Sequence, residues 1–118
     1  MEYISAAASR GGWQLRQAQT RFVKGYITLS RAGQKAGHLD EKTRELIALA
    51  VAVTLRCDGC ITVHTAAALE RGATREEIAE VLGVAVSANA GAAVVYSTRA
   101  LDAFNAAAEI NPNAEENS

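Results

Sequence analysis

Apolar residues recur at steps of three and four from about Gln14 to Gly37, which is the spacing of one face of an α-helix. The stripe consists of Leu15, Ala18, Phe22, Tyr26 and Leu29. This pattern predicts one long helix, whose C-terminal turns are weakened by Gly33 and Gly37 because glycine is a poor helix former.

A second helix is predicted from Glu41 to about Arg56, with Asp40 as its N-cap and His38 in the turn before it. Its residues from Leu46 to Leu55 are apolar almost all round. A helix without a polar face is expected to be buried centrally or sealed against another subunit.

A third helix is predicted from Gly59 to Arg71, since Asp58 can cap a helix start and Gly72 suits the left-handed position that ends one. The segment from Thr74 to Glu77 has the Ser/Thr-x-x-Glu pattern of a capping box. A fourth helix is therefore expected to begin there.

The apolar stripe of the fourth helix consists of Ile78, Val81, Leu82 and Ala85. We expect a break at Ser87 to Gly91, before a last helix that ends near Ala108. The chain is thus predicted to be all-α, a single-domain bundle of about five helices over residues 1–110, with a disordered tail at residues 111–118.

Composition narrows the class of protein. The 118 residues are 49% hydrophobic and carry a net charge of −1, which fits one soluble domain and gives no general attraction to nucleic acid or to an anionic membrane. The apolar run from Leu46 to Leu55 is too short to span a bilayer, and Met1 to Arg10 lacks the pattern of a signal peptide. We therefore expect a cytoplasmic protein, whose alanine-rich core gains burial by forming a homo-oligomer.

The chemistry of the chain is concentrated in Cys57-x-x-Cys60-x-x-x-His64. Cytosolic thiols are kept reduced, so two cysteines at this spacing indicate redox chemistry or a metal. His64 follows Cys60 by one helical turn and can approach its sulfur. Because a helix start and an imidazole both favour the thiolate, Cys60 is the candidate nucleophile and Cys57 the resolving thiol. Arg56 could also stabilise a thiolate or attract an anionic substrate.

Other interpretations of these cysteines remain open. A structural zinc site needs four ligands, and beyond the cysteines and His64 the chain offers only His38 as a nitrogen donor. A permanent disulfide would close a very short loop, and the pair could also be unreactive core cysteines. The aromatic residues Trp13, Tyr26 and Tyr96 are expected in the core or at a subunit interface.

Glu45, eleven intervening residues, the Cys57-x-x-Cys60 pair and His64 together resemble the alkylhydroperoxidase D family, which belongs to the carboxymuconolactone decarboxylase-like superfamily. The resemblance covers roughly Leu39 to Phe104. It implies an all-helical trimer or hexamer in which Cys60 reacts with a hydroperoxide, Cys57 resolves it, and Glu45 and His64 relay protons. It also implies no metal or organic cofactor, and reduction by an external dithiol such as a lipoyl protein or a thioredoxin-like donor.

Two features of the sequence affect the proton relay that the resemblance implies. A number of members of the family have a tyrosine before the second cysteine, where this chain has Gly59. Glu45 precedes Cys57 by twelve residues, about 18 Å of helix, so a helical hairpin must cross or bend to bring Glu45 to His64. The alternatives are an acid-base enzyme of the carboxymuconolactone decarboxylase type, and a redox sensor or assembly protein without turnover.

Overall fold

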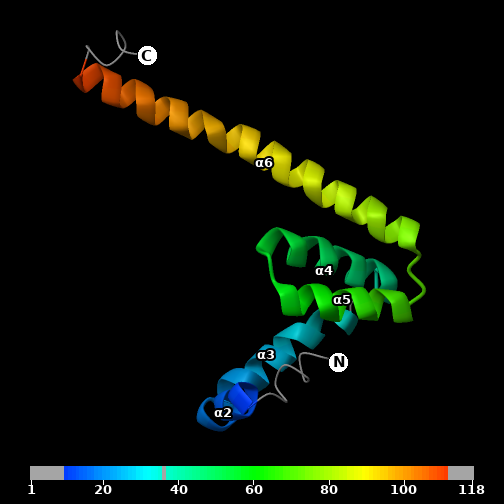
Figure 1. Cartoon of the computed structure of the whole chain (residues 1–118). Coiled ribbons are helices and arrows are strands. Elements are labelled where there is room, and N and C mark those ends of the chain that lie inside the picture. Colours follow the sequence, from blue (N-terminus) through cyan, green and yellow to red (C-terminus); the bar gives the residue numbers. More distant parts are fainter. Residues whose placement is uncertain (1–9, 36, 112–118) are drawn as a thin grey trace.

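The computed structural model describes residues 10–35 and 37–111, and within them every regular element is helical (Figure 1). The elements are α2 (Arg10–Ala18), α3 (Thr20–Ala32), the 3-10 turn η1 (Gly33–Lys35), α4 (Glu41–Leu55), α5 (Asp58–Glu70) and α6 (Arg75–Ile110). The predicted all-α class is confirmed. The predicted tail lies outside the described residues, apart from Asn111.

The core lies where α4 and α5 pack against each other and against the first turns of α6. Leu46, Ala68 and Ala73 form its centre, and Ile78 and Val81 of α6 pack against it. Small side chains let the helices approach closely, but each contributes less buried apolar area than leucine would. The result is a small core that holds α4 and α5 side by side.

The first turn of α4 is fixed by polar contacts to three neighbouring segments. Asp40 caps the helix by accepting a 2.7 Å hydrogen bond from the Thr43 amide. Two ion pairs follow, Glu41 with Arg71 at 2.8 Å and Lys42 with Glu77 at 2.9 Å. Arg44 donates a hydrogen bond to the carbonyl of Gly33, which ties α4 to the end of α3.

The connection from α5 to α6 follows the sequence prediction closely. Gly72 adopts the left-handed conformation, with φ +88°. Thr74 caps α6: its hydroxyl accepts the Glu77 amide hydrogen bond, while the Glu77 carboxylate accepts that of the Thr74 amide. The same carboxylate pairs with Lys42, and these hydrogen bonds lower the pKa of Glu77. The capping box therefore joins the starts of α4 and α6.

The predicted break at Ser87 to Gly91 is wrong, because α6 runs without interruption for 36 residues. A glycine inside a helix costs only about 1 kcal/mol, and the neighbouring alanines favour helix strongly enough to offset it. At about 1.5 Å per residue α6 is roughly 54 Å long, against about 22 Å for α4. Its C-terminal half extends well beyond the α4 and α5 pair (Figure 1).

The single helix predicted from Gln14 to Gly37 is also wrong in its bounds. Gln19 leaves the helical conformation and separates α2 from α3, and α3 ends at Ala32. Gln19 still bonds to both helices: its amide donates to the Leu15 carbonyl, and its carbonyl accepts from the Val23 amide. The apolar spacing continues across such a local distortion, so the spacing could not reveal it.

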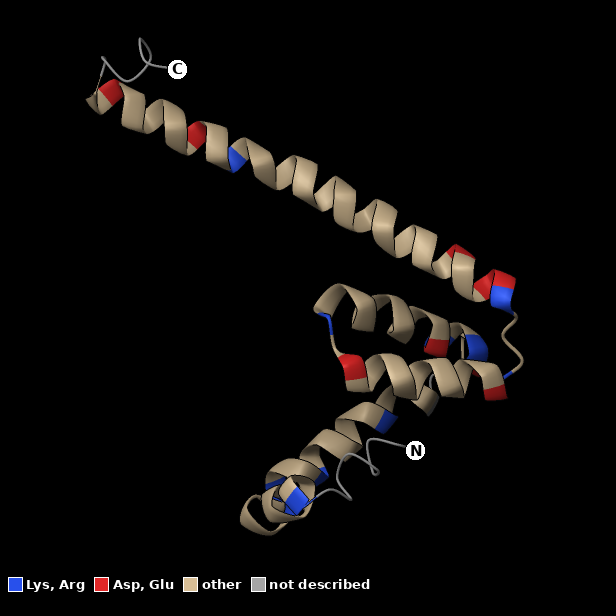
Figure 2. Cartoon of the chain, in the orientation of Figure 1, with Lys and Arg blue, Asp and Glu red and all other residues tan. Residues whose placement is uncertain are grey.

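Large apolar side chains remain exposed on this single chain. Trp13 is 58% exposed, Tyr26 44% and Tyr96 63%, so the prediction of a core position for them is wrong, whereas the interface position stays a prediction. In the described part of the chain one helix, α6, is long and apolar enough to cross a membrane by length and composition alone. Figure 2 shows that charged residues lie toward its two ends.

Candidate functional site

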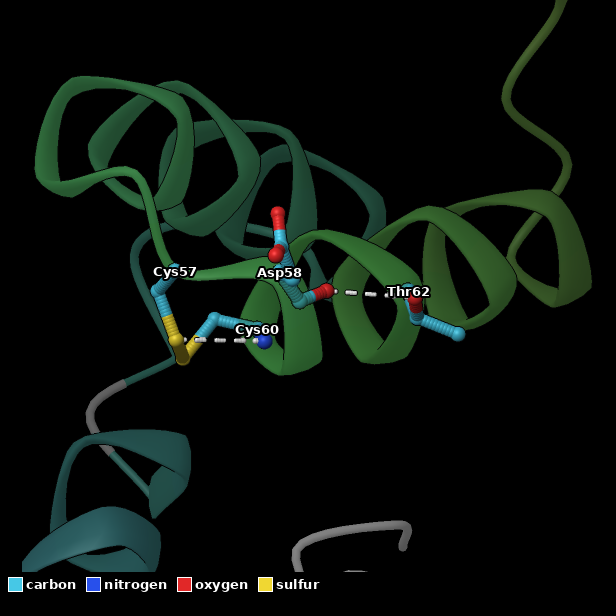
Figure 3. Close-up of a disulfide and its surroundings, with 4 residues drawn as sticks. All are labelled: Cys57, Asp58, Cys60 and Thr62. Carbon is cyan, nitrogen blue, oxygen red and sulfur yellow. Dashed lines mark hydrogen bonds between the residues drawn. A yellow bond between two sulfur atoms is a disulfide. The ribbon is translucent and has the colours of Figure 1, made fainter.

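The two cysteines lie at the turn between α4 and α5 and are joined by a disulfide, with their Cα atoms 5.2 Å apart (Figure 3). Helix α4 ends at Leu55, and Arg56 follows in the left-handed conformation, with φ 57°. This conformation reverses the chain within one residue, so that Cys57 begins α5 in extended backbone. The turn itself therefore brings both sulfur atoms to the first turn of α5.

Cys57, rather than the predicted Asp58, is the N-cap of α5. Its sulfur accepts a 3.3 Å hydrogen bond from the Cys60 amide. An amide at a helix start stabilises negative charge, so this hydrogen bond favours a thiolate at Cys57 once the disulfide is reduced. The helix start therefore favours a thiolate at Cys57, whereas His64 lies one helical turn beyond Cys60.

Glu45 and His64 meet between α4 and α5. Glu45 Oε2 lies 2.7 Å from His64 Nδ1, and the two side chains are only 26% and 13% exposed. In a straight hairpin Glu45 would stand about 6 Å beyond His64, because about 15 Å of α4 but only about 9 Å of α5 separates each from the turn. In the structure the two side chains are nevertheless in contact, so Glu45 does reach His64, which the sequence alone left undecided.

The contact at Nδ1 fits one tautomer of a neutral His64. A neutral imidazole that donates its Nδ1 hydrogen to the Glu45 carboxylate carries its basic lone pair on Nε2. The pair can therefore accept a proton at Nε2 and release it again, which is the work of a general acid-base group.

Gly59 is exposed at the outer side of the dithiol turn. A Cβ atom built there meets nothing within 4 Å, and the backbone has no positive φ, so the site has room for a side chain. The glycine is therefore not required by packing.

The site offers little to a metal ion. Across residues 10–35 and 37–111, no three His, Cys, Asp or Glu side chains are grouped so as to hold one. His38, the remaining nitrogen donor, lies in the bend before α4. The residues that the structure does bring together are Cys57 with Cys60, and Glu45 with His64.

Sequence reasoning missed one polar contact between α4 and α6. The Asn89 amide group donates a 2.8 Å hydrogen bond to the Thr54 hydroxyl. The sequence predicted a break at this position, whereas the continuous α6 holds Asn89 beside α4.

The sequence and the fold of this chain are similar to those of known proteins. The sequence model of the carboxymuconolactone decarboxylase family matches residues 20–103. An uncharacterized protein from Haemophilus influenzae is 46% identical over 92 residues, which are 78% of this chain and 81% of that protein. One from Cupriavidus necator is 38% identical over the same shares of the two chains. The crystal structure of a carboxymuconolactone decarboxylase family protein from Legionella pneumophila superposes with a TM-score of 0.64 at 36% identity, covering 89% of this chain and 96% of that one.

Proposed function

The chain belongs to the carboxymuconolactone decarboxylase family, and we propose that within it the protein is a thiol-dependent peroxidase of the alkylhydroperoxidase D type. The observation that carries the proposal is the 2.7 Å contact between Glu45 and His64, since His64 follows Cys60 by one helical turn. A permanent structural disulfide would have no need of such a pair.

In the first step the Cys60 thiolate attacks the terminal oxygen of a hydroperoxide. The O–O bond breaks, Cys60 is oxidised to a sulfenic acid, and the departing alkoxide takes a proton to become an alcohol. The Cys57 thiol then attacks the sulfenic sulfur, which forms the disulfide and releases water. Together the two steps reduce one peroxide and oxidise the two thiols.

His64 handles the protons of these steps. Its Nε2 accepts the Cys60 proton before attack, and the imidazolium is held by Glu45. The same proton is then available to the alkoxide. The hydrogen bond from the Cys60 amide favours thiolate at Cys57, which suits its role in resolution and as the leaving group when the disulfide is reduced.

An external dithiol completes the cycle by attacking the disulfide and leaving as its own cyclic disulfide. A lipoyl protein or a thioredoxin-like donor has the required chemistry. The remaining proposals are a small hydroperoxide as substrate, no metal or organic cofactor, a cytoplasmic location, and a homo-oligomer, either a trimer or a hexamer.

A second candidate is a redox sensor that forms the same disulfide without turnover. Gly59 favours the sensor, because it has no hydroxyl group at the position where a number of alkylhydroperoxidase D proteins have a tyrosine. Turnover separates the two functions.

The deciding experiment follows peroxide consumption with excess dithiol for the wild type, Cys60→Ser, Cys57→Ser and the exposed control Thr62→Ala. We expect turnover in the wild type and the control, none in Cys60→Ser, and in Cys57→Ser a sulfenic acid that dimedone labels. Unchanged turnover in Cys60→Ser would contradict the mechanism. An inactive wild type that forms a reversible disulfide would support the sensor instead.

A further inference from the structure

Helices α2 and α3 form a positively charged segment at the start of the described chain. Their five basic side chains are accompanied by no acidic one, and these are Arg10, Arg16, Arg21, Lys24 and Arg31. The rest of the chain holds the other seven basic residues and all thirteen acidic ones, so the net charge of −1 conceals this segment. Figure 2 shows Lys and Arg, but no Asp or Glu, on α2 and α3.

Within α3 the apolar and basic side chains lie on different sides of the helix. The large apolar side chains are those of Phe22, Val23, Tyr26, Ile27 and Leu29. At about 100° per residue these five span about 160° of the helix circumference. Arg21, Lys24 and Arg31 lie within about 80° of one another in the remaining part.

The apolar side of α3 is not covered within the chain. Neither α2 nor α3 has a buried residue, and α3 extends away from the α4 and α5 pair (Figure 1). Phe22 is 68% exposed and Leu29 74%, and Trp13 of the adjoining α2 is 58% exposed. Large apolar side chains gather on an exposed surface mainly where a partner covers them.

The basic side of α3 is available to a partner as well. Arg21, Lys24 and Arg31 are exposed, and within residues 10–35 and 37–111 no ion pair involves them. A partner that suits α3 therefore combines negative charge with an apolar interior.

We propose that α2 and α3 bind the surface of an anionic lipid membrane, with α3 lying in the plane of the interface. Its apolar side enters the boundary between headgroups and acyl chains, and its basic side chains contact lipid phosphates. Helices that lie in this way have Lys and Arg on one side and Trp, Phe or Leu on the other, as here. The 13 residues of α3 measure about 20 Å, too short to cross a bilayer.

An anionic membrane fits these observations better than nucleic acid or a second copy of the chain. Nucleic acid would neutralise the basic side, but it would leave Ile27 and Leu29 without an apolar surface to cover them. A second copy offers acidic side chains, but Glu41 and Glu77 are already engaged in ion pairs within their own chain.

The membrane contact does not depend on the peroxidase chemistry, so its test measures binding. The full chain is sedimented with vesicles of phosphatidylcholine, and with vesicles of phosphatidylcholine and phosphatidylglycerol in equal parts. We expect binding to the second kind only, weakened by added salt because salt screens the attraction. The one tryptophan of the chain, Trp13, should shift its fluorescence emission to the blue on binding, since it leaves water.

Two variants test the two sides of α3. Lys24→Glu should weaken binding about 25-fold, because each unit of positive charge near an anionic surface strengthens binding about fivefold. Leu29→Ser should weaken binding about tenfold, because it removes an apolar side chain from the interface. The matched controls Arg75→Glu on α6 and Leu69→Ser on α5, also at exposed positions, should bind as the wild type does.

Three results would overturn the proposal. The first is a wild type that does not sediment with the anionic vesicles, or that does so without a shift in Trp13 emission. The second is a loss of binding in Lys24→Glu but not in Leu29→Ser, which would indicate a purely electrostatic contact of the kind that nucleic acid makes. The third is a molar mass of Leu29→Ser, measured by light scattering without vesicles, below that of the wild type, because a second copy would then cover this side.

Discussion

Glu45 of α4 and His64 of α5, nineteen residues apart in the chain, meet through a 2.7 Å contact between Oε2 and Nδ1. The contact is mostly shielded from solvent, since the side chains are 26% and 13% exposed. It links the helix before the dithiol turn to the helix after it. Any movement that separates α4 from α5 therefore also removes the carboxylate from the imidazole.

The first prediction concerns this pair. We expect His64→Ala to lower the second-order rate constant for peroxide by about 100-fold, because a positioned general base contributes about that much. Glu45→Gln keeps a hydrogen-bond acceptor but loses the charge, so a smaller loss of about 10-fold is expected. Stopped-flow measurement of peroxide consumption would check both values. Added imidazole should partly restore His64→Ala, and a rate equal to that of Thr62→Ala would count against the relay.

The second prediction concerns Gly59. A Cβ atom built at this exposed position meets no neighbour within 4 Å, so Gly59→Tyr should fold normally. If a hydroxyl beside Cys60 joins the proton relay, peroxide turnover should rise by about 10-fold. Gly59→Phe is the control, because it has the same ring without the hydroxyl. Equal rates in the two variants would show that the hydroxyl has no role.

The third prediction concerns Arg56, whose φ of 57° is unfavourable for any residue with a Cβ atom. Arg56→Gly should raise the free energy of unfolding by about 0.5 to 1 kcal/mol, since relief of about 1 to 2 kcal/mol exceeds the entropy that glycine adds to the unfolded chain. Urea denaturation would measure it. Arg75→Gly, in helical backbone, should show no such gain, and a similar gain there would refute the explanation.

The fourth prediction is a loss of stability in acid. Hydrogen bonds from Lys42 and Thr74 lower the pKa of Glu77, and hydrogen bonds from Thr43 lower that of Asp40. A lowered folded-state pKa means that the charged form stabilises the fold above the unfolded pKa, about 4, and that this stability is lost as pH falls through the folded pKa.

The melting temperature, measured from pH 7 to pH 3, should therefore fall at the acid end. This fall should be smaller in Glu77→Gln than in the wild type. Glu76→Gln, one residue away in the same helical turn, leaves the Lys42 and Thr74 contacts in place. The pH dependence of its melting temperature should follow that of the wild type. If the acid-induced fall were equally small in both variants, the role given to Glu77 would be wrong.

Local rules predicted the elements around the site well. The caps at Asp40 and Thr74 and the left-handed glycine at position 72 depend on a few neighbouring residues, and each is present as expected. The resemblance to the carboxymuconolactone decarboxylase superfamily is confirmed, and it rested on four residues of this same segment. The roles of those residues stay predictions.

Features that depend on the whole chain were not predictable from local rules. Spacing could place Cys60 and His64 one turn apart, but the approach of Glu45 depends on how α4 and α5 sit against each other. The prediction of a break at Ser87 to Gly91 overestimated how strongly one glycine destabilises a helix whose neighbouring residues are alanines. That error also concealed the length of α6.

The small core has a consequence for how the protein responds to dilution. Among the described residues the buried apolar set consists of two leucines and five alanines, and no large side chain is fully buried. We expect a chain with so little burial of its own to gain stability from association with other copies, and association follows mass action. Its melting temperature should therefore rise with protein concentration, so the abundance of the protein in its environment becomes one determinant of whether it stays folded.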